Sequence, residues 1–291
     1  MIGTAMEWRE VYGNWVLVPP RPIAIVHFLG GAFVASAPQV TYRSLLEFLA
    51  SQGFVIVATP FVNTLDHTTI AQRVMRLSNL ALEHLQEEVL RRRALPIYGV
   101  GHSMGCKLHL LIGSLFPQER AGNILISFNN YPARRSIPGL EQFSQFSRLT
   151  SQFASQVVSQ FATQLSAQSQ FAIPDFNVEF TPSPEETNQL IAESYQVPRN
   201  LLIKFTNDDI DQTRSLTEVL EYRFPELTSV KILKGNHLTP LGQDLNWQTG
   251  AEFSPFDAIG QFFKQEVSRD INQLKRTLLM WLDPLESSRY W

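Results

Sequence analysis

Residues 101–105 read Gly101-His102-Ser103-Met104-Gly105. The apolar run at 95–100 before them is short enough for a buried strand, and residues 104–116 after them have apolar positions at helical spacing. Glycines two positions before and after a serine are typical of a sharp strand-to-helix turn, because such a turn leaves no room for neighbouring side chains. The sequence therefore predicts that Ser103 is exposed on this turn, where it can act as a nucleophile.

Short apolar runs alternate with longer helical patterns on both sides of the turn. Continuous apolar runs suit strands that are covered on both faces, so the alternation predicts a mostly parallel sheet with helices on both faces. The expected strands are residues 23–28, 54–58, 95–100, 123–128, 201–205 and 230–233, with an antiparallel edge strand at 15–18. The expected helices are residues 42–51, 68–92, 104–116, 212–223 and 255–282.

One stretch breaks this alternation, and it predicts an insertion at 131–198 within a core domain formed by residues 1–130 and 199–291. Its composition shifts to Gln, Ser and Phe, and no charged residue occurs between Thr150 and Pro174. Large apolar residues within it fall three or four positions apart. This spacing is typical of an amphipathic helix, here with an uncharged polar face.

A serine hydroxyl becomes a good nucleophile only when a base takes its proton. The chain has six histidines, of which only His237 lies downstream of the helix expected at 104–116. His237 follows the strand expected at 230–233, where the chain order serine, acid, histidine places the base. We therefore predict that His237 is the general base, and we expect His102 and His109 to be structural.

A carboxylate is also needed, because it holds the histidine ring in its productive tautomer. Three aspartates follow the strand expected at 201–205, where this chain order places the acid. We predict Asp208 as the acid, with Asp209 as the alternative and Asp211 as the cap of the next helix. A calcium site is a competing interpretation, although the loop lacks the spaced ligands and the glycine of known calcium motifs. A solvated turn without such a role is a further alternative.

Two backbone N–H groups are expected to stabilise the oxyanion that forms during attack. One belongs to Met104, directly after the serine. The other belongs to the loop after the strand at 23–28, where Gly31 or Ala32 is the expected donor. This loop looks like the glycine-rich oxyanion loop of lipases and esterases, with Leu29 in place of their histidine and Ala32 in place of their third glycine.

Together these segments resemble the α/β-hydrolase superfamily over residues 15–282, and the resemblance implies an α/β-hydrolase fold. The segments 27–33 and 101–107 also look like those of an uncharacterised hydrolase family of cyanobacteria and plastids. That likeness implies a cytosolic or stromal protein and supplies no substrate. Thr206 departs from the superfamily pattern, which often has a glycine near this point. The difference lies in the loop from which the acid is chosen, so it affects the choice between Asp208 and Asp209.

The resemblance also implies a lid, because the superfamily commonly carries one after the strand that corresponds to 123–128. We therefore expect the helical insertion at 131–198 to cover an apolar substrate pocket, with a permanently packed helical hairpin as the alternative. The residues expected to line the pocket are Phe33, Phe146, Phe153 and Phe161. Burial of an acyl chain against phenyl rings favours medium or long acyl groups.

The composition limits the classes of partner. The formal net charge is −3 and the main basic cluster is Arg91-Arg92-Arg93, so we expect no nucleic-acid partner. A single cysteine, Cys106, excludes an intramolecular disulfide and a cysteine-based zinc cage, and we expect no metal and no cofactor. No apolar run is long enough to predict a transmembrane segment, and the N-terminus lacks a signal-peptide pattern. We expect a cytoplasmic protein, and the sequence leaves its oligomeric state open.

These features favour hydrolysis of a small-molecule ester or thioester through an acyl-enzyme on Ser103. Acyl transfer to an alcohol or amine uses the same intermediate and is the nearest alternative. A non-catalytic member of the fold that binds a lipid or pigment is an alternative of a different class.

Overall fold

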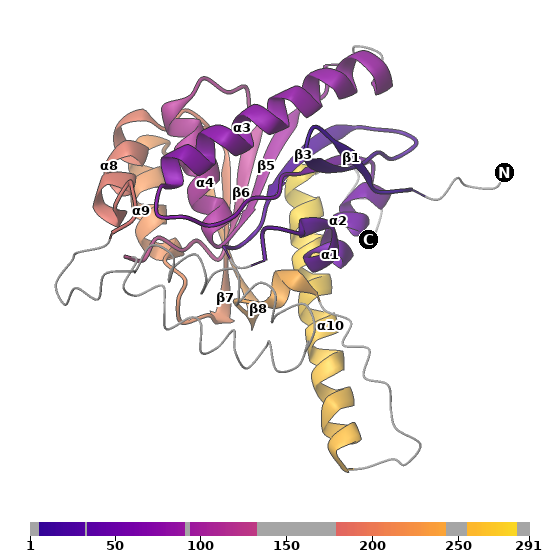
Figure 1. Cartoon of the computed structure of the whole chain (residues 1–291). Coiled ribbons are helices and arrows are strands. Elements are labelled where there is room, and N and C mark those ends of the chain that lie inside the picture. Colours follow the sequence, from indigo (N-terminus) through magenta and orange to yellow (C-terminus); the bar gives the residue numbers. More distant parts are fainter. Residues whose placement is uncertain (1–5, 33, 91–93, 133–178, 243–254, 284–291) are drawn as a thin grey trace, which may run out of the picture.

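The computed structural model of the chain describes residues 6–32, 34–90, 94–132, 179–242 and 255–283. Its centre is an eight-stranded sheet with the order β1-β2-β4-β3-β5-β6-β7-β8. Strands β3 to β8 are parallel to their neighbours among themselves, whereas β2 pairs with β1 and β4 in antiparallel fashion. Helices cover both faces of the sheet, as the alternation of patterns predicts (Figure 1).

The bounds of the elements follow the sequence patterns closely in the middle of the chain. The strands are β1 (Arg9–Val11), β2 (Asn14–Leu17), β3 (Ala24–Leu29), β4 (Phe54–Ala58), β5 (Ile97–His102), β6 (Gly122–Ile126), β7 (Asn200–Asn207) and β8 (Thr228–Asn236). The α-helices are α1 (Pro38–Thr41), α2 (Arg43–Ser51), α3 (His67–His84), α4 (Met104–Leu115), α8 (Pro184–Ser194), α9 (Thr213–Arg223) and α10 (Pro255–Leu282). A π-helical turn, η1 (Leu85–Val89), continues α3, and a 3-10 turn, η2 (Thr239–Leu241), follows β8.

The two faces of the sheet are covered by different helices. Buried leucines of α2 and α10, such as Leu45 and Leu274, pack on one face against Val26 and Ile124. On the other face α4 lies between α3 and the pair α8 and α9, as Figure 1 also shows. None of the helices in the described part of the chain is both long and apolar enough to cross a membrane.

The N-terminal hairpin corrects one expectation about the sheet. β2 is antiparallel as predicted, but it is not the edge strand, because β1 pairs with its outer side. The two strands are joined by Tyr12 and Gly13, which both have positive φ values, 48° and 74°. Such a two-residue turn matches the twist of paired strands, and a tyrosine at its first position gave no sequence signal for it.

Helix α8 lies within the range expected for the insertion at 131–198, and it packs against the core. Its Ile191, together with Tyr195 and Val197 just after the helix, is buried with residues of α4 and the sheet. Ser183 caps its N-terminus in a reciprocal pair of hydrogen bonds with Glu186. Of the expected insertion, residues 133–178 lie outside the described residues.

The start of α4 lies unusually close to the end of β3. A Cβ atom on Gly105 would lie 2.1 Å from the carbonyl oxygen of Leu29, and one on Gly101 would lie 2.7 Å from the backbone of Gly105. Because these neighbours are backbone atoms, a side chain at either position would force the helix away from the sheet. Both glycines of the motif are therefore required for the position of Ser103 between them.

Candidate active site

Ser103 connects β5 to α4 with backbone angles of φ 55° and ψ −119°. Non-glycine residues rarely adopt a positive φ, because Cβ then crowds the backbone. The N–H of Ser103 donates to the carbonyl oxygen of Ile126 over 2.9 Å, and α4 begins at the next residue. These contacts hold Ser103, which is partly exposed, at the carboxyl ends of the parallel strands.

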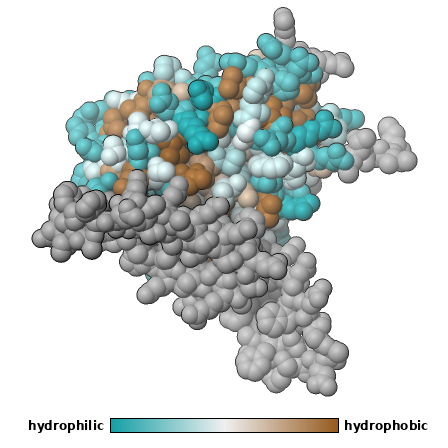
Figure 2. All heavy atoms as spheres, in the orientation of Figure 1, coloured by the Kyte–Doolittle hydropathy of each residue, from teal (hydrophilic) through white to brown (hydrophobic). Residues whose placement is uncertain are grey.

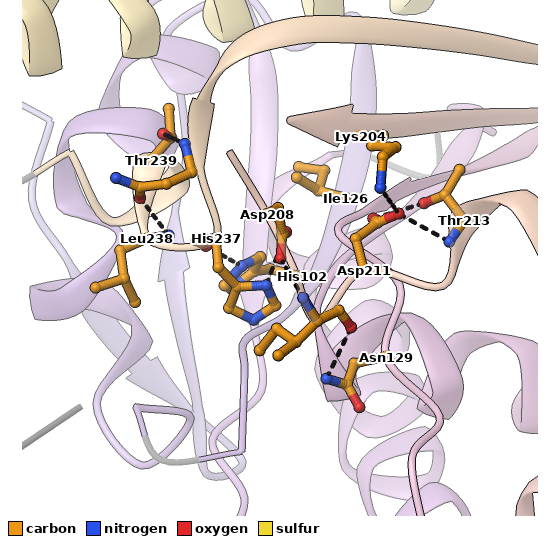
Figure 3. A network of polar contacts seen from close by, with 12 residues as sticks. His102, Ile126, Asn129, Lys204, Asp208, Asp211, Thr213, His237, Leu238 and Thr239 are labelled. Carbon is orange, nitrogen blue, oxygen red and sulfur yellow. Dashed lines mark hydrogen bonds and ion pairs between the residues drawn. The ribbon is translucent and has the colours of Figure 1, made fainter. Parts of the chain in front are cut away.

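Asp208 and His237 come from the loops after β7 and β8 and are joined by a hydrogen bond. Nδ1 of His237 lies 2.9 Å from Oδ2 of Asp208 (Figure 3). The side chain of Asp208 is fully buried, and its Oδ1 accepts a hydrogen bond from the N–H of Ile210. Because the carboxylate accepts from Nδ1–H, Nε2 of the neutral ring is left with a free electron pair, as a general base requires.

The pKa of Asp208 is lowered from its ordinary value, although two effects oppose each other. Burial is the largest single effect and raises the pKa, but the hydrogen bond and the charge of His237, with smaller contributions from Ser127 and the N–H of Ile210, together lower it more. The carboxylate is therefore ionised at neutral pH and stabilises a positive charge on His237.

The other two aspartates of this loop have different surroundings. Asp209 is exposed. Asp211 forms an ion pair with Lys204 at 3.2 Å and accepts hydrogen bonds from the backbone N–H and the hydroxyl of Thr213. Figure 3 shows its carboxylate directed to these groups rather than to His237. Within the described residues, no three His, Cys, Asp or Glu side chains are grouped so as to hold a metal ion.

His237 also lies beside the serine turn. Its ring centroid is 4.9 Å from that of His102, the residue before Ser103. Its carbonyl oxygen is 2.8 Å from Nε2 of His102. The structure therefore brings the predicted base and acid to the same edge of the sheet as the predicted nucleophile.

The loop after β3 packs directly against Ser103. A Cβ atom on Gly31 would lie 3.4 Å from Cβ of Ser103. Of the two oxyanion donors expected from this loop, Gly31 donates its N–H to the hydroxyl of Tyr42 over 2.8 Å. Ala32 is the other expected donor, and Met104 occupies the first position of α4. Phe33 lies outside the described residues, as do Phe146, Phe153 and Phe161.

Sequence reasoning missed Tyr42 altogether. Its hydroxyl contacts both Gly31 and Nδ1 of His102, the latter at 2.7 Å. The residue lies at the start of α2, 60 positions before His102, and no local pattern marks the contact. His102, expected to be structural, is indeed buried, but its hydrogen bonds connect two loops of the candidate site.

Solved structures share this architecture. The Pyrococcus furiosus esterase Pf2001 matches with a TM-score of 0.53 and 15% sequence identity, covering 92% of this chain and 92% of its own. A second crystal form of that esterase gives a TM-score of 0.51 and 13% identity, with 92% and 91% covered. The S-formylglutathione hydrolase FrmB from Staphylococcus aureus gives a TM-score of 0.49 and 14% identity, with 94% and 98% covered. At such identities the likeness to the esterase shows the fold alone.

The sheet order, the strained serine turn and the likeness to the Pyrococcus furiosus esterase define a protein with the α/β-hydrolase fold. The family model described as "Protein of unknown function (DUF1350)" matches residues 7–284, and the chain belongs to that family. No curated protein matches the sequence.

The lowered pKa of Asp208 predicts how the free energy of unfolding changes at acid pH. The ionised carboxylate stabilises the fold above the ordinary carboxyl range, and this contribution is lost as the pH falls through the folded-state pKa. In urea denaturation, the free energy of unfolding of the wild type should therefore decline more steeply between about pH 5 and pH 2 than that of Asp208→Asn. Asp209→Asn, which changes an exposed carboxylate, should follow the wild type. Parallel curves for the wild type and Asp208→Asn would contradict this account of the pair.

Proposed function

We propose that the protein is a serine hydrolase that cleaves an ester or thioester through an acyl-enzyme on Ser103. The observation that carries the proposal is the hydrogen bond between His237 and buried Asp208, formed beside a serine in a strained strand-to-helix turn. A strained nucleophile turn with an oriented base next to it is the arrangement that serine-dependent acyl chemistry requires. The α/β-hydrolase fold is compatible with this chemistry, although the fold alone does not imply it.

In the proposed reaction, Oγ of Ser103 attacks the acyl carbon while Nε2 of His237 takes the hydroxyl proton. Asp208 stabilises the resulting imidazolium. The N–H groups of Met104 and Ala32 would donate to the oxyanion of the tetrahedral intermediate. Collapse of that intermediate expels the alcohol or thiol, which takes the proton from His237. Water, activated by the same base, then releases the carboxylic acid and restores the serine.

Ser103→Ala should abolish labelling by a fluorophosphonate probe and lower ester turnover by several orders of magnitude, because only the attacking oxygen is removed. The measurement is probe labelling of the purified wild-type and variant proteins, combined with turnover of p-nitrophenyl esters. Circular dichroism and the unfolding midpoint serve as controls for the fold, since the residue is partly exposed. Undiminished turnover in Ser103→Ala would rule out the proposal.

Asp208→Asn should lower kcat strongly, whereas Asp209→Asn should change it little. Only the residue that accepts from Nδ1 of His237 fixes the ring tautomer and stabilises imidazolium, and in this structure that contact belongs to Asp208. The two variants form a matched pair, since each replaces one carboxylate by an amide at adjacent positions. If Asp209→Asn were the more impaired of the two, the acid would have to be reassigned to Asp209.

We further propose that the substrate is a small molecule with a medium or long acyl chain and that the protein acts in the cytoplasm. Support comes from the apolar cluster on which the serine turn and the loop after β3 lie, which includes Leu29, Ala35, Phe61 and Met104. The phenylalanine content of residues 133–178 is consistent with an apolar acyl group. The likeness of segments 27–33 and 101–107 to a cyanobacterial and plastid family is consistent with this location.

Catalytic efficiency should therefore rise along a series of p-nitrophenyl esters from acetate to decanoate. Each buried methylene contributes about 0.8 kcal/mol, which corresponds to an increase of roughly fourfold in kcat/KM per carbon. Phe153→Ser or Phe161→Ser should flatten the series while leaving turnover of the acetate ester unchanged. A strict preference for acetate, unaffected by either substitution, would show that the substrate is small.

A further inference from the structure

Three hydrogen bonds form a continuous chain through the candidate site. The N–H of Gly31 donates to the hydroxyl of Tyr42 over 2.8 Å. That hydroxyl lies 2.7 Å from Nδ1 of His102, and Nε2 of His102 lies 2.8 Å from the carbonyl oxygen of His237. The chain thus begins on the loop after β3, passes through the serine turn and ends on the loop that carries the proposed base.

The chemistry of the end groups fixes the direction of every bond in the chain. A carbonyl oxygen can only accept, so Nε2 of His102 carries the hydrogen that is donated to His237. In the neutral ring Nδ1 is then the acceptor, and the hydroxyl of Tyr42 donates to it. The oxygen of Tyr42 is left to accept from the N–H of Gly31. Each of the three hydrogen bonds therefore has a single direction.

Burial keeps both rings in these states. Tyr42 is 0% exposed and His102 is 2% exposed. Burial and, secondarily, the proximity of His237 lower the pKa of His102 to about 3, against smaller opposing effects of the hydrogen bond to His237 and of Asp208. Burial also raises the pKa of Tyr42. Neither group changes its protonation state near neutral pH, so the direction of the chain persists throughout the working range.

We propose that Tyr42 and His102 are positioning residues that couple the oxyanion loop to the loop of the general base. Tyr42 fixes the peptide of Gly31, directly before the proposed donor Ala32. His102 fixes the backbone of His237, while Asp208 fixes its ring (Figure 3). The base is thereby held at two points, its carbonyl oxygen and its Nδ1. This inference rests on the proposed function, because it assigns the two residues to the same site.

The two glycines of the oxyanion loop allow the close approach of both rings. A Cβ atom on Gly30 would lie 2.8 Å from the ring of Tyr42, and one on Gly31 would lie 3.3 Å from Nδ1 of His102. A side chain at position 30 would displace the tyrosine ring, whereas one at position 31 would require a smaller shift of His102. Tyr42 also makes an edge-on contact with Phe28, with ring centroids 4.7 Å apart.

Tyr42→Phe tests the hydrogen bonds alone, since it keeps the ring and removes only the hydroxyl. We expect kcat for p-nitrophenyl esters to fall by roughly tenfold or more, with KM changed less than about threefold, because the acyl pocket is left intact. Tyr98→Phe is the matched control: this tyrosine is 8% exposed on β5, packs edge-on against Trp281, and should keep wild-type kcat after the same substitution. An unchanged kcat in Tyr42→Phe would overturn the proposal.

Substitutions of His102 provide a second test by rescue and by non-additivity. His102→Gln keeps one acceptor and one donor and should retain more activity than His102→Leu, which keeps neither. Since both residues belong to one chain of hydrogen bonds, kcat of the Tyr42→Phe/His102→Leu double variant should be no lower than that of His102→Leu alone. The proposal would be contradicted if kcat fell equally in His102→Gln and His102→Leu. It would also be contradicted if the decreases in kcat of the two single variants multiplied in the double variant.

A measurement without substrate separates this inference from the proposed function. In ¹⁵N spectra of the histidine rings, His102 should show the Nε2–H tautomer without titration between about pH 5 and pH 8. Tyr42→Phe should shift the Nδ1 signal of His102 and also the ring signals of His237, whereas Tyr98→Phe should leave both in place. If Ser103 failed to react with the fluorophosphonate probe, the proposed function would fail, and these spectra would still decide the coupling. An undisturbed His237 in Tyr42→Phe would overturn it.

Discussion

The contact between the first turn of α4 and the end of β3 determines the geometry of everything around Ser103. The backbone of Gly105 lies so close to the carbonyl oxygen of Leu29 that a methyl group would meet it at 2.1 Å. Because this approach brings the serine turn against the loop after β3, Gly31 lies beside Cβ of Ser103 and the ring of Tyr42 contacts Gly30. A helix even slightly farther from the sheet would separate Ser103 from the loop after β3. The arrangement of the side chains around Ser103 therefore depends on this backbone packing.

The parallel sheet then supplies the remaining groups. In a parallel sheet the carboxyl ends of the strands lie at one edge, and loops from different strands meet there. The loops after β3, β5, β7 and β8 thereby bring together Gly31, Ser103, Asp208 and His237, which span more than two thirds of the chain. Hydrogen bonds between these loops join His237 to Asp208 and to His102. The bond from His102 to the carbonyl oxygen of His237, 135 positions away, is the longest of these connections in sequence.

The sequence predicted those features that depend on local pattern. Short apolar runs predicted strands β3 to β8, although Lys204 and Lys231 interrupt those of β7 and β8. Ser103, Asp208 and His237 each lie after one of these strands, so their shared edge could be inferred. Contacts between distant residues left no local signal. In the sequence, Tyr42 is only the first residue of an expected helix. Its hydrogen bond to His102 becomes apparent only in the structure. The capping pattern at Ser183 and Glu186 was present in the sequence, but the change of composition that begins at 131 concealed the helix that it starts.

Burial distinguishes His102 and His109 from His237. Desolvation lowers the pKa of His102 and of His109 to about 3, and in His109 the charge of Arg120 adds to this effect. Both rings are therefore neutral near neutral pH. His237 lies at the rim instead, with 16% of its side chain exposed and a buried carboxylate on Nδ1. Burial that keeps His102 neutral also strengthens the electrostatic interaction between buried Asp208 and a protonated His237.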